Sequence, residues 1–381
     1  MDVYSYSFSS TLRILFRLGP SVAADLGDVE VLIDLPVKAA VQRCIVVWSS
    51  PVCVPVLTAL QLESPYDQQP MYKEKRSSQS EFVPIRGLNY HVQRWGSRPG
   101  AGSTPPPLVL LHGWMDVGAS YQFMVDAFTE AFVQGRTIIA PDWRGFGQTG
   151  PSQGSGQADH YWFGDYLADL DFLLDHYAPD QAVDLVGHSM GGNVAMLYAG
   201  VRPARIRKLV NLEGFGLPAS QASQAPGRYA QWMDELKALH RGELALKAYN
   251  DVGGVARRLM RTNPRLSPDK ANWLASHWAR PDADGKWQIL GEPAHKVTSA
   301  QLYRLDEVLE IYQRISAPTL AMEASDDSMA IWWKGKYTLA EYHERLKQVP
   351  QVQVAVIEDA GHMLHHDQPV QLARLIEDFL T

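Results

Sequence analysis

The stretch Gly187-His188-Ser189-Met190-Gly191 decides the fold of this 381-residue chain, because it places a serine between two glycines directly after an apolar run. Residues 182–186 predict a buried strand and residues 192–199 predict the helix that follows it. A strand that turns sharply into a helix forces its corner residue toward strained backbone angles, and flanking glycines leave room for that turn. Ser189 is therefore expected to stand exposed at a helix N-terminus, where its hydroxyl group can act as a nucleophile.

A serine hydroxyl group needs a base that accepts its proton. His362 is the predicted base, because it lies on a loop directly after the strand-like run 352–357. His365 and His366 compete for that role, and the three histidines together could also suggest a metal cluster. No cysteine or carboxylate elsewhere falls at the spacing of metal ligands, so the sequence predicts neither a metal site nor a cofactor.

A third group, normally a carboxylate, must orient that base, and it is expected between serine and histidine in the chain. Asp327 fits this position, since it follows the strand-like run 317–323, and the adjacent Asp326 is its rival. A second alternative is Glu213, at the end of the apolar run 208–212, one strand earlier. A carboxylate in such a loop is commonly just solvated, so all three candidates remain open at this point.

From about Phe82 to the C-terminus, the chain resembles the α/β-hydrolase superfamily. Four motifs carry the resemblance, in the expected order: the His-Gly oxyanion loop, the Asp-x-Arg-Gly-x-Gly loop, the serine elbow and the histidine loop. They are residues 110–114, residues 141–149, residues 187–192, and Gly361-His362 with Asp367 and Pro369 downstream. The resemblance implies an α/β fold with a mostly parallel eight-stranded sheet flanked by helices, and a helical cap inserted after the sixth strand.

The resemblance also implies roles for particular residues. Alignment by spacing selects Asp327 as the acid, although members usually carry Gly-x-x-Asp where this chain has Ala324-Ser325-Asp326-Asp327. Glu213 stays the alternative acid, because some members place this residue after the sixth strand. The oxyanion hole would consist of the backbone amides of Trp114 and Met190, since fixed amide dipoles stabilise the charge that develops on an acyl oxygen.

The expected domain organisation follows from the same alternation of strands and helices. Residues 79–214 and 299–381 form the catalytic domain, and residues 215–298 form the helical cap, whose aromatic side chains could line an apolar pocket. Residues 1–78 form an N-terminal extension, expected to be poorly ordered.

We therefore expect a cofactor-independent serine hydrolase that cleaves an ester, thioester or related acyl bond of a small molecule through an acyl-enzyme intermediate. The alternatives are a hydrolase of carbon–carbon bonds in diketones, which uses the same triad, and a non-catalytic ligand-binding protein of this fold. An Asp nucleophile would have indicated an epoxide hydrolase or haloalkane dehalogenase, and Ser189 argues against both. Residues 145–150 satisfy a dinucleotide fingerprint, but residues 151–156 cannot readily begin the helix that it requires.

Composition narrows the class of partners and the compartment. The net charge of -7 and the pI of about 5.9 argue against nucleic-acid binding, which needs clustered basic residues. The two cysteines, Cys44 and Cys53, lie outside the expected catalytic domain, which is typical of a reducing cytoplasm. The apolar run 44–62 is interrupted by Pro51 and Pro55, so no membrane segment is expected there. No oligomeric state is predicted.

Overall fold

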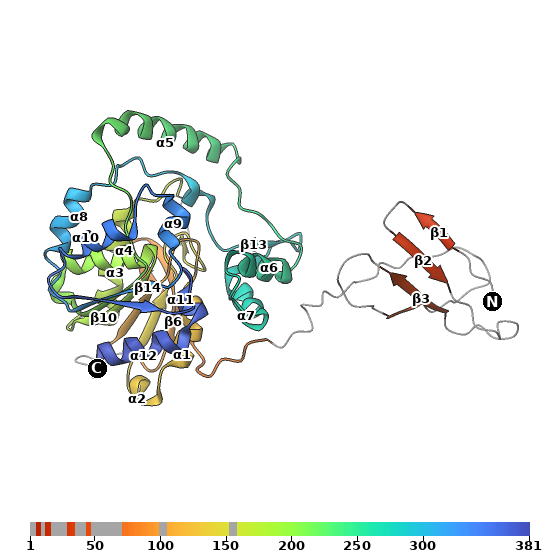
Figure 1. Ribbon diagram of the computed structural model, residues 1–381, viewed down its shortest axis with the longest axis horizontal. Helices are drawn as coiled ribbons and strands as arrows, with labels where there is room; N and C mark the ends of the chain where they lie inside the picture. The colour runs from red at the N-terminus through yellow and green to blue at the C-terminus, as the bar shows by residue number, and fades with distance from the viewer. Residues whose placement is uncertain are drawn as a thin grey trace, which may run out of the picture. The chain divides into compact units, whose positions relative to one another are not determined.

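The chain divides into two compact units, Met1–Leu62 and Glu63–Thr381. The computed structural model describes residues 71–98, 105–151 and 158–381, and before them only the backbone of four strands. Those strands pair antiparallel in chain order (Figure 1): β1 (Ser5–Phe8), β2 (Leu12–Phe16), β3 (Val29–Asp34) and β4 (Arg43–Val46). Otherwise the expected poorly ordered extension lies, up to residue 70, outside the described residues.

Residues 71–78, which that extension was expected to include, are bonded to the second unit. The Tyr72 hydroxyl donates to Asp126 at 2.8 Å, and the Arg76 amide donates to the same carboxylate at 2.8 Å. The Trp273 indole N–H donates to Glu74 at 2.9 Å. These eight residues therefore pack against α1 (Gln122–Ala127) and the inserted segment, and are not a separate extension.

A nine-stranded sheet runs through the second unit, and eight of its strands form one continuous order, β15-β14-β11-β10-β7-β8-β6-β5. Every neighbouring pair is parallel except those that contain β6. The strands are β5 (Gln79–Ile85), β6 (Leu88–Trp95), β7 (Leu108–Leu111), β8 (Ile138–Pro141), β10 (Val183–His188), β11 (Ile206–Leu212), β14 (Thr319–Ala324) and β15 (Val352–Ile357), with β9 (Gly150–Pro151) paired to β6. The expected mostly parallel eight-stranded sheet is confirmed.

Helices cover both faces of this sheet, because its central strands β7, β8 and β10 are wholly buried and β7 and β8 carry apolar side chains on both faces. One core cluster holds side chains of α3 (Phe163–Tyr177), α4 (Met190–Val201), α8 (Leu305–Tyr312) and α10 (Leu339–Leu346). The other cluster holds those of α1 (Gln122–Ala127), α11 (Leu364–Asp367) and α12 (Pro369–Leu380). The carboxyl ends of the parallel strands meet at one edge, where ligands bind in such folds.

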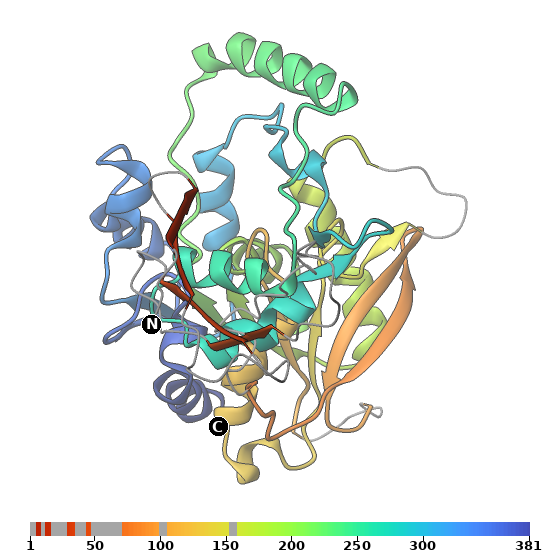
Figure 2. The same ribbon diagram turned by 90° about the vertical axis from the view of Figure 1, so that its right-hand side faces the viewer.

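The segment inserted between β11 and β14 has two parts. The helices α6 (Val252–Thr262) and α7 (Pro268–Trp278) pack together beside the hairpin β12 (Ala279–Pro281) and β13 (Trp287–Ile289), in a third apolar cluster that also contains Phe123. The helix α5 (Ala225–His240) has no buried residue and stands clear of the other helices in both views (Figure 2). Among the described residues, no helix has the length and apolarity needed to cross a membrane.

An aromatic stack ties the end of this segment to the catalytic domain. The His295 ring lies between two rings, with centroid distances of 3.7 Å to Phe146 and 3.9 Å to Tyr161. The Tyr161 hydroxyl also donates to Glu292 at 2.7 Å. Burial lowers the pKa of His295 from 6.5 to about 3, because the stack excludes the water that would stabilise an imidazolium ion.

This shift predicts a pH-dependent stability. Between pH 6.5 and about 3 the unfolded chain binds a proton at His295 that the folded chain does not, so the free energy of unfolding falls as the pH is lowered. We expect His295 to cost the fold roughly 2 kcal/mol at pH 5 relative to pH 7. The variant His295→Phe keeps the stack and should lack this dependence. Urea unfolding of both proteins at the two pH values measures the difference, and equal losses would contradict the assignment.

Candidate active site

Ser189 occupies the corner between β10 and α4, with φ 52° and ψ -115°. The amide of Ser189 donates to Leu212 O at 2.8 Å, which holds the corner against the neighbouring strand β11. A Cβ atom at Gly187 would lie 2.3 Å from the Gly191 carbonyl oxygen, and one at Gly191 would lie 2.1 Å from the Leu111 carbonyl oxygen. Both glycines are therefore required by close backbone approach, and the strained angles fall on the serine as expected for a nucleophile elbow.

The loop after β7 lies directly over this corner. A Cβ atom at Gly113 would come within 3.1 Å of Ser189 Cβ. His112 fixes the loop: its Nδ1 donates to Gly113 O at 2.7 Å, and its Nε2 accepts from the Trp143 amide at 2.9 Å. Burial lowers the pKa of His112, so this imidazole is neutral and serves as a structural link.

The two residues predicted to form the oxyanion hole flank Ser189. Met190 is the first residue of α4, so its N–H has no partner within the helix and is free to meet an anion. Trp114 directly follows Gly113 in the overlying loop, and its side chain is 55% exposed. The indole therefore lies at the surface of the site, and only the backbone of Trp114 is suited to hold an oxyanion.

His362 is paired with Glu213. The distance from His362 Nδ1 to Glu213 Oε2 is 2.7 Å, and Glu213 is buried. The other Glu213 oxygen accepts from the Ala324 amide at 2.8 Å, and Oε2 also accepts from the Ser328 hydroxyl at 2.9 Å. The carboxylate is thus held by three donors, and a proton on His362 Nδ1 leaves the lone pair of Nε2 free to act as a base.

Asp327, the acid selected from the sequence, is not bonded to His362; the candidate carboxylate that is bonded to His362 is the alternative, Glu213. Asp327 caps the N-terminus of α9 (Ser328–Trp333), where its carboxylate accepts from the Ala330 amide at 2.9 Å. Its rival Asp326 forms an ion pair with Arg265 at 2.7 Å. An aspartate one residue before a helix satisfies the free N–H groups of the first turn, which is a common structural role for this residue type.

A turn at the end of β11 aims Glu213 at the site. Asn211 donates to Gly214 O at 3.0 Å and accepts from the Gly214 amide at 2.9 Å, so its side chain closes the turn around the glutamate. Glu213 itself has φ 52°, a left-handed conformation that is uncommon for this residue type. The sequence Asn-Leu-Glu-Gly was the available signal for this residue, because an asparagine and a glycine around one acid indicate a constrained turn.

The rival bases His365 and His366 face other partners. His366 Nε2 is bonded to the Ser120 hydroxyl at 2.8 Å, and His365 lies with Nε2 3.8 Å from Asp116 Oδ2; both rings are buried. Of the three histidines, only His362 touches the buried glutamate. The edge of the Trp332 ring packs against His362, with the ring centroids 4.2 Å apart, and so limits its rotation.

The second glycine-rich loop is structural. Gly145 and Gly147 have φ values of 73° and 56°, and a Cβ atom at Gly147 would lie 2.0 Å from Asp142 Oδ2. Strand β9, not a helix, follows the loop. Arg144 forms two bonds to the buried Asp169, at 2.6 and 2.7 Å, and thereby fixes the loop to α3. These glycines are explained by tight turns, and the dinucleotide reading stays rejected.

Comparison with known proteins supplies independent evidence for the fold. A family model described as the alpha/beta hydrolase fold matches residues 106–369. The chain therefore belongs to the alpha/beta hydrolase fold family.

Among its relatives is the AB hydrolase superfamily protein YfhM of Bacillus subtilis, 23% identical over 79% of this chain and 97% of that protein. Another is the mouse sn-1-specific diacylglycerol lipase ABHD11, 25% identical over 80% and 90% of the two chains. Among solved structures, the thioesterase domain from the curacin biosynthetic pathway superposes with a TM-score of 0.65, at 23% identity, over 79% of this chain and 99% of that one. At this identity the structural likeness shows the fold alone.

Proposed function

We propose that this chain is a cofactor-independent serine hydrolase that cleaves an acyl bond through an acyl-enzyme intermediate. The observation that carries the proposal is the 2.7 Å contact between His362 and the buried Glu213, beside a serine held at a strained elbow. A carboxylate paired with an imidazole, together with a serine at a nucleophile elbow, supplies the groups that nucleophilic acyl transfer requires.

The residues divide the reaction between them. His362 Nε2 accepts the proton of Ser189 Oγ as the oxygen attacks the acyl carbon, and Glu213 stabilises the imidazolium ion that forms. The amides of Trp114 and Met190 hold the oxyanion. The proton then passes from His362 to the leaving alcohol or thiol. A water molecule, deprotonated by the same imidazole, attacks the acyl-enzyme and releases the acid, which restores the free serine.

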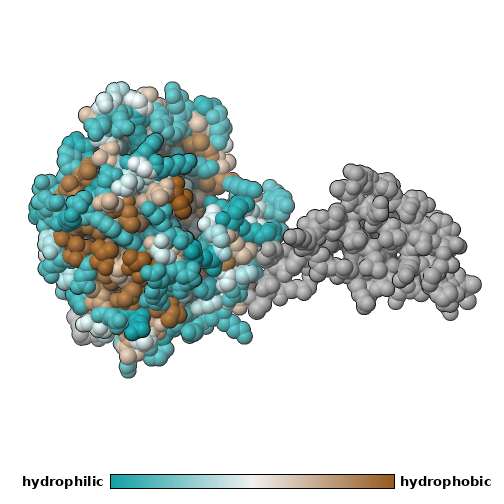
Figure 3. All heavy atoms as spheres, viewed as in Figure 1, coloured by the Kyte–Doolittle hydropathy of each residue, from teal (hydrophilic) through white to brown (hydrophobic). Residues whose placement is uncertain are grey.

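Apolar side chains at the rim favour an apolar acyl group. Trp114 is 55% exposed, and Trp332 and Ile331 on α9 are 45% and 68% exposed. Figure 3 shows apolar side chains reaching the surface in several patches on one face of the unit. Each methylene group that a substrate buries against such a rim adds about 0.8 kcal/mol of transfer free energy. The relative named an sn-1-specific diacylglycerol lipase supports the same substrate class here.

A second apolar space lies below α5. A cavity of about 160 Å³ is lined by Trp162, Trp232 and Gln301, among others. Trp273 and Trp278, in contrast, are buried in the apolar cluster of α6 and α7. Trp232 therefore lines a cavity, whereas Trp273 and Trp278 pack inside the inserted segment.

A panel of activated substrates tests the proposal. Purified protein should turn over p-nitrophenyl esters of two to eight carbons, with kcat/KM rising with chain length, and a fluorophosphonate probe should label Ser189 and block that turnover. Turnover of a diketone panel without ester cleavage would instead indicate carbon–carbon hydrolysis. If the protein neither turns over these substrates nor reacts with the probe, that result would indicate a ligand-binding protein. The variant Asp327→Asn is the matched control for labelling, because it alters an acid outside the pair.

A further inference from the structure

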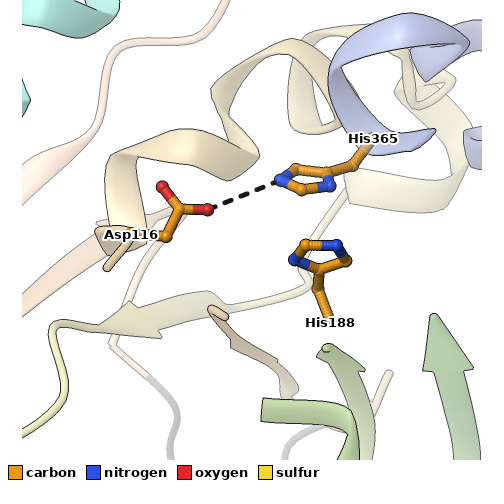
Figure 4. Close-up of side chains that lie close together, drawn as sticks. All are labelled: Asp116, His188 and His365. Carbon is orange, nitrogen blue, oxygen red and sulfur yellow. Dashed lines mark ion pairs between the residues drawn. The ribbon is translucent and has the colours of Figure 1, made fainter. Parts of the chain in front are cut away.

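A second polar cluster lies next to the site, where His188 precedes Ser189 in the chain and is bonded to the backbone of His362. It consists of Asp116 from the loop after β7, His188 at the end of β10 and His365 in α11 (Figure 4). These residues are only 3%, 2% and 0% exposed. One ligand-type atom of each lies within 4.8 Å of the other two, although the three residues are far apart in the sequence.

Hydrogen bonds to neighbouring residues fix the orientation of Asp116 and of His188. Asp116 Oδ1 accepts from the Val117 amide at 2.9 Å, the Ser120 hydroxyl at 2.6 Å and the Trp278 indole at 3.0 Å. Asp116 Oδ2 is buried and has no hydrogen-bond partner among the described residues.

His188 is held in the same way from its far side. Its Nε2 donates to the backbone oxygen of His362 at 2.8 Å, so its Nδ1 carries the lone pair, and Nδ1 is buried without a partner among the described residues. Neither ring nitrogen of His365 has a hydrogen-bond partner there, and its Nε2 lies 3.8 Å from Asp116 Oδ2. A buried polar atom without a hydrogen bond destabilises the fold, so an occupant that bonds to these atoms together would stabilise it.

The donor set suits zinc. Two imidazole nitrogens and one carboxylate oxygen are common Zn²⁺ ligands, and a backbone oxygen that accepts from the far side of a ligating histidine is the usual supporting contact. Bonds of about 2.1 Å in a tetrahedral site place ligand atoms about 3.4 Å apart. The pair Asp116–His365 is already at 3.8 Å, and a ligand atom of His188 lies within 4.8 Å of both, so small side-chain rotations would complete the site.

We propose that Asp116, His188 and His365 form a binding site for Zn²⁺, and that its occupation slows hydrolysis at Ser189. The binding stands on the cluster alone, while the effect on the rate rests on the proposed function. His188 immediately precedes Ser189 and its Nε2 holds the backbone of His362. A shift of His188 toward a metal ion therefore moves the nucleophile and the base relative to each other.

Equilibrium dialysis of the full chain against Zn²⁺, with metal analysis of the protein, tests the binding without an activity assay. One zinc ion should bind per chain to the wild type, and His365→Gln and Asp116→Asn should each weaken binding at least tenfold. His366→Gln is the matched control, because His366 is equally buried on the same helix but is bonded to Ser120, and it should retain binding. If His365→Gln does not fold, Asp116→Asn still decides the result.

Activity supplies the second readout. Zinc should lower kcat with little change in KM, EDTA should restore it, and His365→Gln should be insensitive at the same zinc concentration. Absence of bound zinc, equal binding by His365→Gln, or a crystal structure grown with zinc that shows a water molecule between the three side chains would each overturn the proposal. If the zinc-free protein hydrolyses no substrate, the proposed function fails, and dialysis still decides the zinc site.

Discussion

Ser189→Ala and His362→Ala should each remove nearly all turnover, and the double variant should be little worse than either single variant. The two residues act as one unit, because the serine is a poor nucleophile without the base and the base has no other nucleophile to activate. Residual rates should stay above the uncatalysed reaction, since the amides of Trp114 and Met190 are untouched. Burst and steady-state kinetics with an activated ester measure all three proteins.

If the double variant instead loses activity by the product of the two single-variant factors, the two side chains do not act in one step. The matched control is Ser120→Ala, which removes a buried hydroxyl group that is bonded to Asp116 and His366 but belongs to neither partner of the proposed reaction. It should change stability more than turnover.

The acid gives the second large effect. Glu213→Gln should lower kcat by roughly three to four orders of magnitude, because an amide in place of the carboxylate favours the wrong imidazole tautomer and no longer stabilises the imidazolium ion. Asp327→Asn should leave kcat within a fewfold of the wild type. Its expected effect is a small loss of helix stability, at most about 1 kcal/mol, since asparagine also caps helices well.

Both substitutions replace a carboxylate with an amide. The difference between their effects on kcat therefore reports which position holds the acid. A larger loss of kcat for Asp327→Asn than for Glu213→Gln would return the acid to the loop after β14. A thermal melt of each variant separates catalysis from folding, because Glu213 also accepts bonds from Ala324 and Ser328 and its replacement should lower the melting temperature.

The sequence was sufficient for features that depend on local pattern. The run 108–111 and the run 352–357 match β7 and β15 residue for residue, because a strand of a parallel sheet is a short, mainly apolar run bounded by turn residues. β7 is buried throughout, while β15 is the edge strand and leaves Val354 and Val356 exposed. The corner at Ser189 was equally readable, since strand, glycine, serine, glycine and helix follow one another within twenty residues.

The choice between Glu213 and Asp327 could not be read in the same way. Both follow an apolar strand, on neighbouring strands β11 and β14, so chain order and spacing treat them alike. What separates them is the turn closed by Asn211 and the first turn of α9, which consumes the Asp327 carboxylate. The cluster of Asp116, His188 and His365 was missed for a related reason: its members are brought together only by the packing of α11 against the ends of β7 and β10.

The residues proposed as nucleophile and acid share a strained backbone conformation, and this strain affects how the sequence can evolve. Ser189 and Glu213 both have φ 52°, a conformation that costs a side-chain-bearing residue about 1–3 kcal/mol. Glycine at position 189 would relieve that strain and yield a sturdier but inactive protein. At position 213 the relief is offset by the loss of the bonds to Ala324, Ser328 and His362. A lineage released from selection for hydrolysis would therefore gain stability by losing the Ser189 side chain, and the retention of this side chain in a relative marks an enzyme still under selection for its chemistry.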